Sequence, residues 1–269
     1  MKALLILIGV LIAIFVIVTL AVYLLQDRML FFPNPLSSQT RKNLKNFEIR
    51  FDHDGVELCG WLYLKEGADS LPFVIYYGGN GEEISWNFKR FTELSVSGFL
   101  LVNYRGYGDS EGNPSAAALK SDAAFIFDEL VAREGVASNE IVLVGRSLGS
   151  GVAIDLANNR PVAGLLLVTP FDRLSSIGSH HYPFLPVRRM LRHKMESIDL
   201  APEISVPSLV VLAENDHTIP PKYGRRLYEA LAGPKELVTI PHADHNNLNG
   251  HEEYWRAFDG FLGTVLRAE

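Results

Sequence analysis

Residues 141–158 read IVLVGRSLGSGVAIDLAN, and this stretch decides the fold. An apolar run at 141–144 predicts a buried strand, GRSLG follows at 145–149, and small and apolar residues then permit a helix packed on a sheet. A strand that turns sharply into a helix strains the backbone, and side chains two positions away on either side would collide. The two glycines therefore predict a nucleophile elbow with Ser147 as the nucleophile. The alternative is a loop serine that caps the helix.

Further short apolar runs without alternation lie on both sides of this stretch, separated by segments of helix length. Such runs are typical of strands buried on both faces, and strands that alternate with helices predict a mostly parallel central sheet with helices on both faces. The ligand site of such a sheet lies at the carboxyl ends of its strands, so functional residues are expected directly after each run. The runs lie at 73–77, 99–104, 141–144, 163–168 and 209–212.

An antiparallel hairpin is expected at the start of the globular part of the chain. Residues 47–52 and 57–65 have the pattern of strands, and Asp54 and Gly55 between them are typical of a tight turn. Since no internal repeat or second core is visible, we predict one globular domain at residues 44–269.

A serine hydroxyl needs a base, and the base needs a group that orients it, in the chain order serine, acid, histidine. Asp216 follows the strand pattern at 208–213 and is the predicted acid. One alternative is that Asp216 is a turn aspartate bonded to its own backbone. Another is that Asp172, which follows the preceding strand, is the catalytic acid.

The general base is expected in the loop after the last strand, which we predict at 235–240. His245 lies in that loop and is the predicted base. His242 and His251 lie close by in the sequence, so the alternative is that His245 is a loop histidine beside the true base.

The tetrahedral intermediate of acyl transfer needs two preorganised hydrogen-bond donors. We predict the backbone N–H groups of Leu148, at the start of the helix after the nucleophile, and of Asn80, in the GGNG loop at 78–81. The alternative for the loop is a simple turn between strand and helix. Glu82 and Glu83 are expected in the first turn of the next helix, where the dipole favours carboxylates and no catalytic role is needed.

Several other kinds of site are excluded by composition and spacing. A net charge of −6, a pI of about 5.8 and scattered cations argue against nucleic-acid binding. The glycine-rich stretch 103–115 lacks the pattern of a phosphate-binding loop, and His180, His181 and His217 lack the spacing of metal ligands. Cys59 is the single cysteine and is expected to be a small buried apolar residue. We expect no cofactor and no metal.

The amino-terminal part of the chain predicts a membrane anchor at residues 1–27. Residues 3–25 form an apolar run interrupted only by Gly9 and Thr19, and about 20 such residues cross a bilayer. A cleavable signal peptide is the alternative, but the run exceeds its usual length and no convincing cleavage site follows. The short tail before the run favours an N-inside anchor, which would place the catalytic domain outside the cytoplasm.

Two connecting segments complete the predicted organisation. Residues 28–43 form a linker, in which Pro33 and Pro35 oppose regular structure and aromatic residues suit a membrane interface. Residues 171–207, between two strands, form a short lid that includes a basic, helix-like stretch at 187–194. A lid of this length predicts a fairly open pocket beneath it.

These features together resemble the small-lid α/β-hydrolases of the bud-emergence type, which are membrane-anchored serine hydrolases. That family usually shows His-Gly-Asn where this chain has Gly78-Gly79-Asn80, a difference that leaves the backbone donor in place. The matching segments are the anchor followed by FFP at 31–33, NYRGYGDSEG at 103–112, GRSLG at 145–149, YPFLP at 182–186, and the loops of Asp216 and His245.

The resemblance implies an α/β-hydrolase fold with a short lid, preceded by one transmembrane helix, and hydrolysis of acyl esters or thioesters without a metal or organic cofactor. The expected partners are a small-molecule or lipid acyl ester and the membrane. An aminopeptidase-like hydrolase is an alternative, although that relative usually needs a larger helical cap. A non-catalytic binding protein on the same fold, tethered to the membrane, is the other.

Overall fold

The computed structural model describes residues 1–68 and 70–266, and its centre is one 8-stranded sheet with the order β1-β2-β4-β3-β5-β6-β7-β8. The pairs β1–β2 and β2–β4 are antiparallel and all other neighbours are parallel, which confirms the predicted mostly parallel sheet. The strands are β1 (Glu48–His53), β2 (Val56–Leu64), β3 (Phe73–Tyr77), β4 (Gly98–Val102), β5 (Ile141–Arg146), β6 (Gly164–Val168), β7 (Ser208–Ala213) and β8 (Lys235–Ile240).

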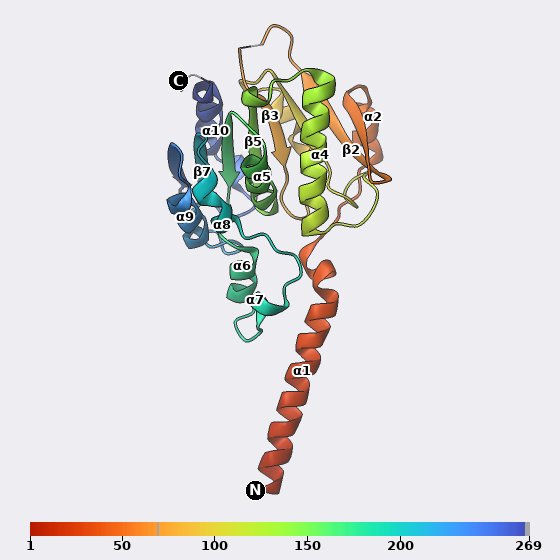
Figure 1. Ribbon diagram of the computed structural model, residues 1–269, viewed down its shortest axis with the longest axis vertical. Coiled ribbons are helices and arrows are strands. Elements are labelled where there is room, and N and C mark those ends of the chain that lie inside the picture. The colour runs from red at the N-terminus through yellow and green to blue at the C-terminus, as the bar shows by residue number, and fades with distance from the viewer. Residues whose placement is uncertain (69, 267–269) are drawn as a thin grey trace.

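Helices cover both faces of this sheet, each over its own apolar core (Figure 1). Helices α4 (Ala116–Glu134), α5 (Leu148–Asn159) and α9 (Pro221–Ala230) lie on one face, and α3 (Phe88–Phe91) and α10 (Glu252–Val265) lie on the other. Strands β3, β4, β6 and β7 are buried along their whole length, which explains their continuous apolar sequences.

The predicted hairpin is formed by β1 and β2. Its register pairs Glu48 with Trp61 and His53 with Val56. Asp54 and Gly55 both have positive φ, at 55° and 70°, as a two-residue turn that follows the twist of the strands requires.

Cys59 lies in β2 and is fully buried. Burial raises the pKa of its thiol to about 12, because a thiolate is poorly solvated there. The thiol therefore stays protonated, and the residue is the small buried apolar side chain that the sequence predicts.

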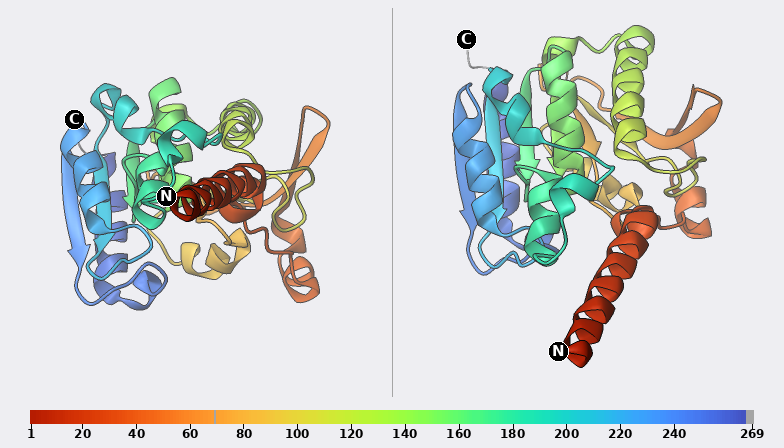
Figure 2. Two further views of the ribbon diagram at one scale, coloured as in Figure 1. Left: turned by 90° about the horizontal axis from the view of Figure 1, so that it is seen from below. Right: turned by 60° about the horizontal axis from the view of Figure 1, so that its bottom comes forward.

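Helix α1 (Lys2–Leu30) projects away from the globular domain (Figures 1 and 2). By length and composition it can cross a membrane, since an 18-residue window has a mean hydropathy of 3.3 and none of that window is buried. A signal sequence meets the same criteria. The helix continues to Leu30, so the irregular structure expected from residue 28 begins only at Phe31. Pro33 restricts the residue before it and leaves the earlier residues free to be helical.

The 171–207 insertion connects β6 to β7 and lies on the same side of the domain as α1 (Figure 1). It contains α6 (Leu174–His181), α7 (Val187–Met190) and α8 (Ser197–Leu200). The helix predicted over the basic stretch 187–194 ends at Met190. The N–H of Arg192 donates instead to Oε1 of Gln26 in α1, at 2.7 Å, so a side chain from another element replaces the helical acceptor.

Candidate active site

Ser147 lies between the end of β5 and the start of α5, in the strained turn that the sequence predicts. Its φ is +50°, a conformation that residues with side chains rarely adopt. A Cβ atom on Gly145 would lie 2.5 Å from the carbonyl oxygen of Gly149, and one on Gly149 would lie 2.0 Å from that of Tyr77. Only glycine fits at either position, so the motif is a steric requirement of this turn.

The side chain of His245 links Ser147 to Asp216. Its Nε2 lies 3.0 Å from Oγ of Ser147, and its Nδ1 lies 2.7 Å from Oδ2 of Asp216. The other carboxylate oxygen of Asp216 accepts the N–H groups of Thr218 and Ile219, at 2.9 and 2.7 Å. All three of the linked side chains are buried. The geometry is that of a nucleophile, a base and the group that orients the base.

The rival residues lie in other environments. Oδ1 of Asp172 accepts the N–H of Arg173, and its Oδ2 faces Arg226, so its carboxylate belongs to a local cluster. The side chain of His242 is 89% exposed and lies beside Glu214, while His251 precedes α10. The structure therefore brings Asp216 and His245 to Ser147, and none of these three alternatives.

The two predicted oxyanion donors flank the same site. Across residues 1–68 and 70–266, neither the N–H of Leu148 nor that of Asn80 donates to a protein acceptor. The side chain of Asn80 fixes its own backbone, because its Oδ1 accepts from Tyr107 Oη at 2.8 Å and from the N–H of Phe32 at 3.1 Å. Its Nδ2 donates to the carbonyl oxygen of Leu30 at the end of α1. Both donors thus remain free beside Ser147.

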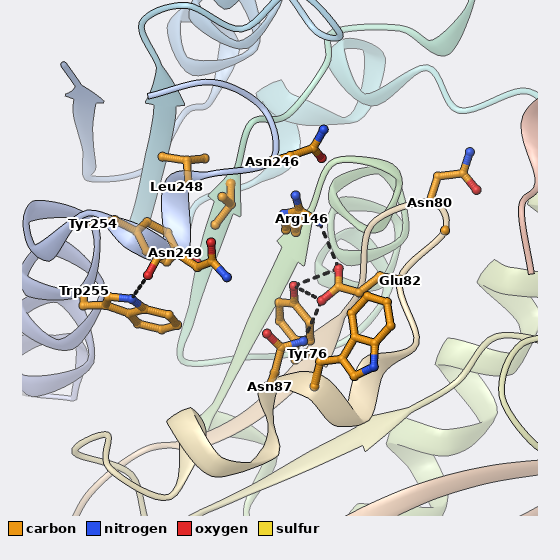
Figure 3. Close-up of a pocket in the computed structure, with 13 residues that line it drawn as sticks. Tyr76, Asn80, Glu82, Asn87, Arg146, Asn246, Leu248, Asn249, Tyr254 and Trp255 are labelled. Carbon is orange, nitrogen blue, oxygen red and sulfur yellow. Dashed lines mark hydrogen bonds and ion pairs between the residues drawn. The ribbon is translucent and has the colours of Figure 1, made fainter. Parts of the chain in front are cut away.

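The Glu82 carboxylate binds the 78–81 loop through hydrogen bonds, a role that the sequence did not suggest (Figure 3). Its carboxylate accepts the N–H of Gly79 at 2.7 Å, the hydroxyl of Tyr76 at 3.0 Å and the amide of Asn87 at 2.5 Å. Arg146, directly before the nucleophile, forms an ion pair with it at 3.2 Å and also donates to the carbonyl oxygen of His245. Glu82 therefore joins the donor loop, the elbow and the histidine loop.

Burial and neighbouring groups shift the pKa values of Tyr76 and Arg146 in this cluster. Burial raises the pKa of the Tyr76 phenol well above its usual range, and the charge of Glu82 adds to the shift, so Tyr76 remains a donor. Burial alone would lower the pKa of Arg146, but its neighbours Tyr76, Glu82 and Tyr254 outweigh that effect and raise it. Neither Glu82 nor Glu83 lies in the first turn of an α-helix as expected: they precede the short 3₁₀ helix Ile84–Asn87, and the Glu83 side chain is its cap.

Replacing Glu82 with alanine is expected to lower the free energy of unfolding by about 3–5 kcal/mol, because it leaves the mostly buried charge of Arg146 without its partner. Chemical denaturation in detergent measures this change. Glu93→Ala is the matched control, since Glu93 forms an exposed pair with Arg90 and its loss is expected to cost less than about 0.5 kcal/mol. Equal effects of the two substitutions would show that the cluster is not structurally important.

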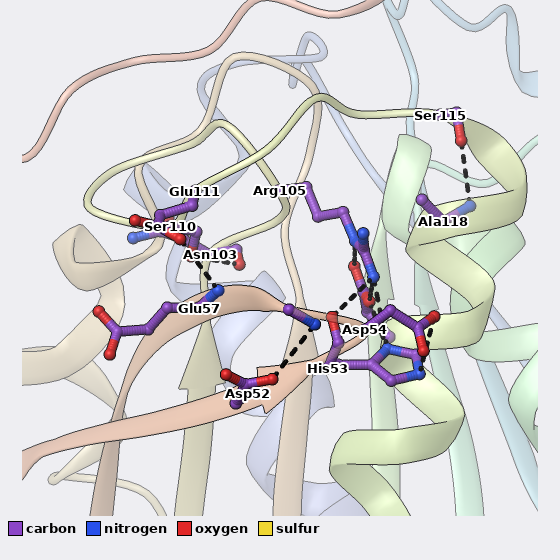
Figure 4. A network of polar contacts seen from close by, with 12 residues as sticks. Asp52, His53, Asp54, Glu57, Asn103, Arg105, Ser110, Glu111, Ser115 and Ala118 are labelled. Carbon is purple, nitrogen blue, oxygen red and sulfur yellow. Dashed lines mark hydrogen bonds and ion pairs between the residues drawn. The ribbon is translucent and has the colours of Figure 1, made fainter.

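The glycine-rich stretch at 103–112 is held by a separate polar network on the other side of the sheet (Figure 4). Arg105 binds both carboxylate oxygens of Asp122 in α4 at 2.6 Å, and His53 of β1 binds the same carboxylate at 2.8 Å. Ser110 accepts the N–H of Cys59 at 2.9 Å. These contacts are consistent with the structural role predicted for the stretch.

One cavity is lined by Ser147, and a second cavity adjoins it at Asn80 and Asn246. The first, of about 300 Å³, is mostly apolar, and its lining includes Ser147, His245, Leu148 and Phe171. The second, of about 380 Å³, lies on the far side of Asn80 and Asn246 and contains the Glu82 and Arg146 cluster (Figure 3). Among the described residues, no group of three or more His, Cys, Asp or Glu side chains is arranged to hold a metal ion.

Comparison with known proteins identifies the family of this chain. The family model described as "Alpha/beta hydrolase family" matches residues 78–196. An uncharacterised protein of Mycobacterium tuberculosis is 34% identical over 227 residues, which are 82% of this chain and 81% of that protein. The chain belongs to the alpha/beta hydrolase family.

Other relatives of this alpha/beta hydrolase are named proteins. Human protein ABHD12B is 33% identical over 71% of this chain and 60% of its own length. The zebrafish (Danio rerio) lysophosphatidylserine lipase ABHD12 is 30% identical over 75% of this chain, which spans only 55% of that protein. The solved structure of a Pyrococcus furiosus esterase shares the fold, with a TM-score of 0.66 at 18% identity over 88% of this chain and 98% of that one. The narrower resemblance to the small-lid, bud-emergence type stays a prediction.

Proposed function

We propose that this alpha/beta hydrolase is a membrane-anchored serine hydrolase that cleaves carboxylic ester or thioester bonds through an acyl-enzyme intermediate. The observation that carries the proposal is the unbroken chain of contacts from Asp216 through His245 to the hydroxyl of Ser147. Two unpaired backbone donors beside that hydroxyl support it, because acyl transfer needs both the nucleophile and the oxyanion site.

In this proposal Ser147 Oγ attacks the carbonyl carbon while His245 Nε2 takes the hydroxyl proton. The N–H groups of Leu148 and Asn80 stabilise the oxyanion, and Asp216 stabilises the imidazolium and keeps its ring oriented. Collapse of the tetrahedral intermediate breaks the bond to the leaving group, which receives the proton from His245. Water, activated by His245, then attacks the acyl-enzyme, releases the carboxylic acid and restores the Ser147 hydroxyl.

A lipid ester is the substrate class that the surroundings support best. The cavity at Ser147 is mainly apolar, with Leu148, Phe171 and Ile177 in its wall. Relatives include a protein named as a lysophosphatidylserine lipase, which suggests a lipid substrate for this chain also.

A retained membrane anchor fits the structure better than a cleaved signal. Leu30 and Phe32 line the cavity at Ser147, and Asn80 is bonded to both residues. Removal of α1 would take away part of the wall and the acceptor that holds the side chain of Asn80. We therefore propose that α1 stays attached and spans the membrane.

The test is ester hydrolysis by the full chain in carbonate-washed membranes. We expect the protein to remain in the washed membrane fraction and to release p-nitrophenol from p-nitrophenyl butyrate. Purified in detergent, it should give a burst equal to the enzyme concentration when deacylation is slow. Hydrolysis no faster than with heat-denatured protein would contradict the enzymatic proposal. Release of the protein by carbonate would contradict the anchor.

A further inference from the structure

An apolar cavity of about 490 Å³ lies between α1 and the 171–207 insertion. Four residues of α1 form one wall, at the helical spacing that places them on one face of the helix. Residues of α6, α7 and the loop between them form the other wall. The α1 residues are Val22, Gln26, Met29 and Leu30, and the facing residues include Leu174, Ile177, Tyr182, Leu185, Val187 and Met190.

Polar contacts fix α1 against this insertion. Gln26, which is buried, accepts the N–H of Arg192 at 2.7 Å and donates to the carbonyl oxygen of Met190 at 3.4 Å. Asp27 forms an ion pair with Arg192 at 2.8 Å and a hydrogen bond with Nε2 of His193 at 2.5 Å. The end of α1 is therefore a fixed part of the domain, and the cavity has two defined walls.

The cavity continues to the proposed nucleophile. It shares five lining residues with the cavity at Ser147, and both of them contain apolar side chains of α6. A chain-like ligand can thus pass from the face of α1 to the Ser147 hydroxyl without crossing a charged side chain. The shared residues are Leu30, Asn80, Leu174, Ile177 and Thr218.

We propose that the last turns of α1 and the 171–207 insertion form an acyl-chain groove, and that its occupant is the hydrocarbon chain of a single-chain membrane lipid ester. The chain enters from the bilayer beside α1 and places its ester carbonyl at Ser147. This inference rests on the proposed function and adds that the membrane helix itself is part of the substrate site.

The position of the groove along α1 supports a lipid occupant. The helix has 29 residues, and about 20 of them, at a rise of ~1.5 Å each, cross the hydrocarbon core. When the hydrocarbon core of the bilayer surrounds α1 from its amino-terminal end, the segment from Val22 to Leu30 lies at the level of the lipid headgroups. The groove then opens where a lipid chain leaves the bilayer.

The tip of the insertion has the composition of a membrane interface. The loop between α6 and α7 lies on the side of the domain from which α1 projects (Figure 2). On it Phe184 is 66% exposed and Tyr182 is 40% exposed, and the exposed cations Arg188 and Arg189 follow. Aromatic side chains prefer the headgroup level of a bilayer, and cations bind the phosphates there.

The adjoining cavity of about 380 Å³ does not suit a hydrocarbon chain. It contains the carboxylate of Glu82 and the guanidinium of Arg146, with the amides of Asn87, Asn246 and Asn249 around them. Methylene groups in that space would remove water from charged and polar groups, which is unfavourable. The acyl chain is therefore directed toward α1.

The test compares Met29→Trp with Leu24→Trp in the full chain, reconstituted in phosphatidylcholine vesicles. Met29 lines the groove, whereas Leu24 lies on the same helix, is 63% exposed and does not line it. We measure kcat/KM for p-nitrophenyl palmitate and for p-nitrophenyl butyrate. The ratio of the two is expected to fall by about tenfold or more in Met29→Trp, because a bulky ring shortens the groove. It is expected to stay within about twofold of wild type in Leu24→Trp.

The outcomes separate this inference from the proposed function. If wild type hydrolyses the butyrate ester and the palmitate-to-butyrate ratio is the same in Met29→Trp, the groove is not an acyl site and the inference fails alone. An equal fall of the ratio in both variants would also overturn it, since the effect would not depend on the face of α1. If wild type hydrolyses neither ester, the proposed function itself is contradicted.

Discussion

Replacing Ser147 with alanine is expected to lower kcat for ester hydrolysis by roughly ten-thousand- to million-fold. The substitution removes the atom that forms the bond to the acyl group and leaves only the oxyanion donors and the binding groove to assist water. The rate of p-nitrophenyl butyrate hydrolysis, measured with purified protein at saturating substrate, gives the size of the effect.

Ser179→Ala is the matched control for this substitution. Ser179 lies in α6, near the groove but outside the lining of the cavity at Ser147 and of the cavity that adjoins it, so its loss is expected to change kcat by less than about threefold. Comparable unfolding temperatures for the two variants show that each protein is folded. Full activity in folded Ser147→Ala protein would rule out this residue as the nucleophile.

Replacing Asp216 with asparagine is expected to lower kcat by about ten-thousand-fold. The carboxylate accepts from Nδ1 of His245, which leaves Nε2 free to take the proton of Ser147. An asparagine amide in its place can donate to Nδ1, which favours the tautomer with the proton on Nε2, and that tautomer cannot act as the base. The comparison is made at several pH values, so that a shifted pH profile is not mistaken for a loss of rate.

Asp172→Asn separates the two candidate acids. Asp172 is also buried and also follows a strand, but its carboxylate contacts Arg173 and Arg226 and not His245. We expect kcat of this variant to stay within about tenfold of wild type. If Asp172→Asn is the more damaging substitution, the assignment of the acid to Asp216 is wrong.

The central strands and the elbow were predictable because their signals are local. A strand buried on both faces must be apolar along its length, as in β6 and β7, and this is visible in a single run of sequence. The elbow depends on two close backbone contacts, at Gly145 and Gly149, that a reader of the sequence can infer from the geometry of the turn. The prediction of His245 and Asp216 as partners of Ser147 used the chain order serine, acid, histidine and the position of each residue after a predicted strand.

Glu82 was not predicted because its role depends on distant partners. Its carboxylate meets Arg146, 64 positions along the chain, and no spacing pattern encodes that contact. The only local signal was its place three residues after Gly79, whose N–H it accepts. Its position before the next predicted helix indicated only a favourable interaction with the helix dipole.

The contacts at the carboxyl end of α1 were likewise not predictable from the sequence, because they join distant residues. Gln26 and Arg192 are 166 positions apart, yet their bond both fixes α1 and prevents α7 from continuing past Met190. Sequence patterns predicted a linker at 28–43 between the anchor and the globular domain, whereas the structure joins α1 to the domain directly through Gln26 and Asp27. The carboxyl end of α1, which the sequence indicated only as a membrane tether, therefore forms one wall of the proposed groove.

The most direct test of the account is the site of covalent modification by a fluorophosphonate probe. The full chain in detergent is treated with the probe, digested, and mapped by tandem mass spectrometry, with Ser147→Ala treated in parallel. We expect one modified peptide that carries the phosphonyl group on Ser147, and no labelling of the variant. An unlabelled wild type, or equal labelling of Ser147→Ala, would contradict the account.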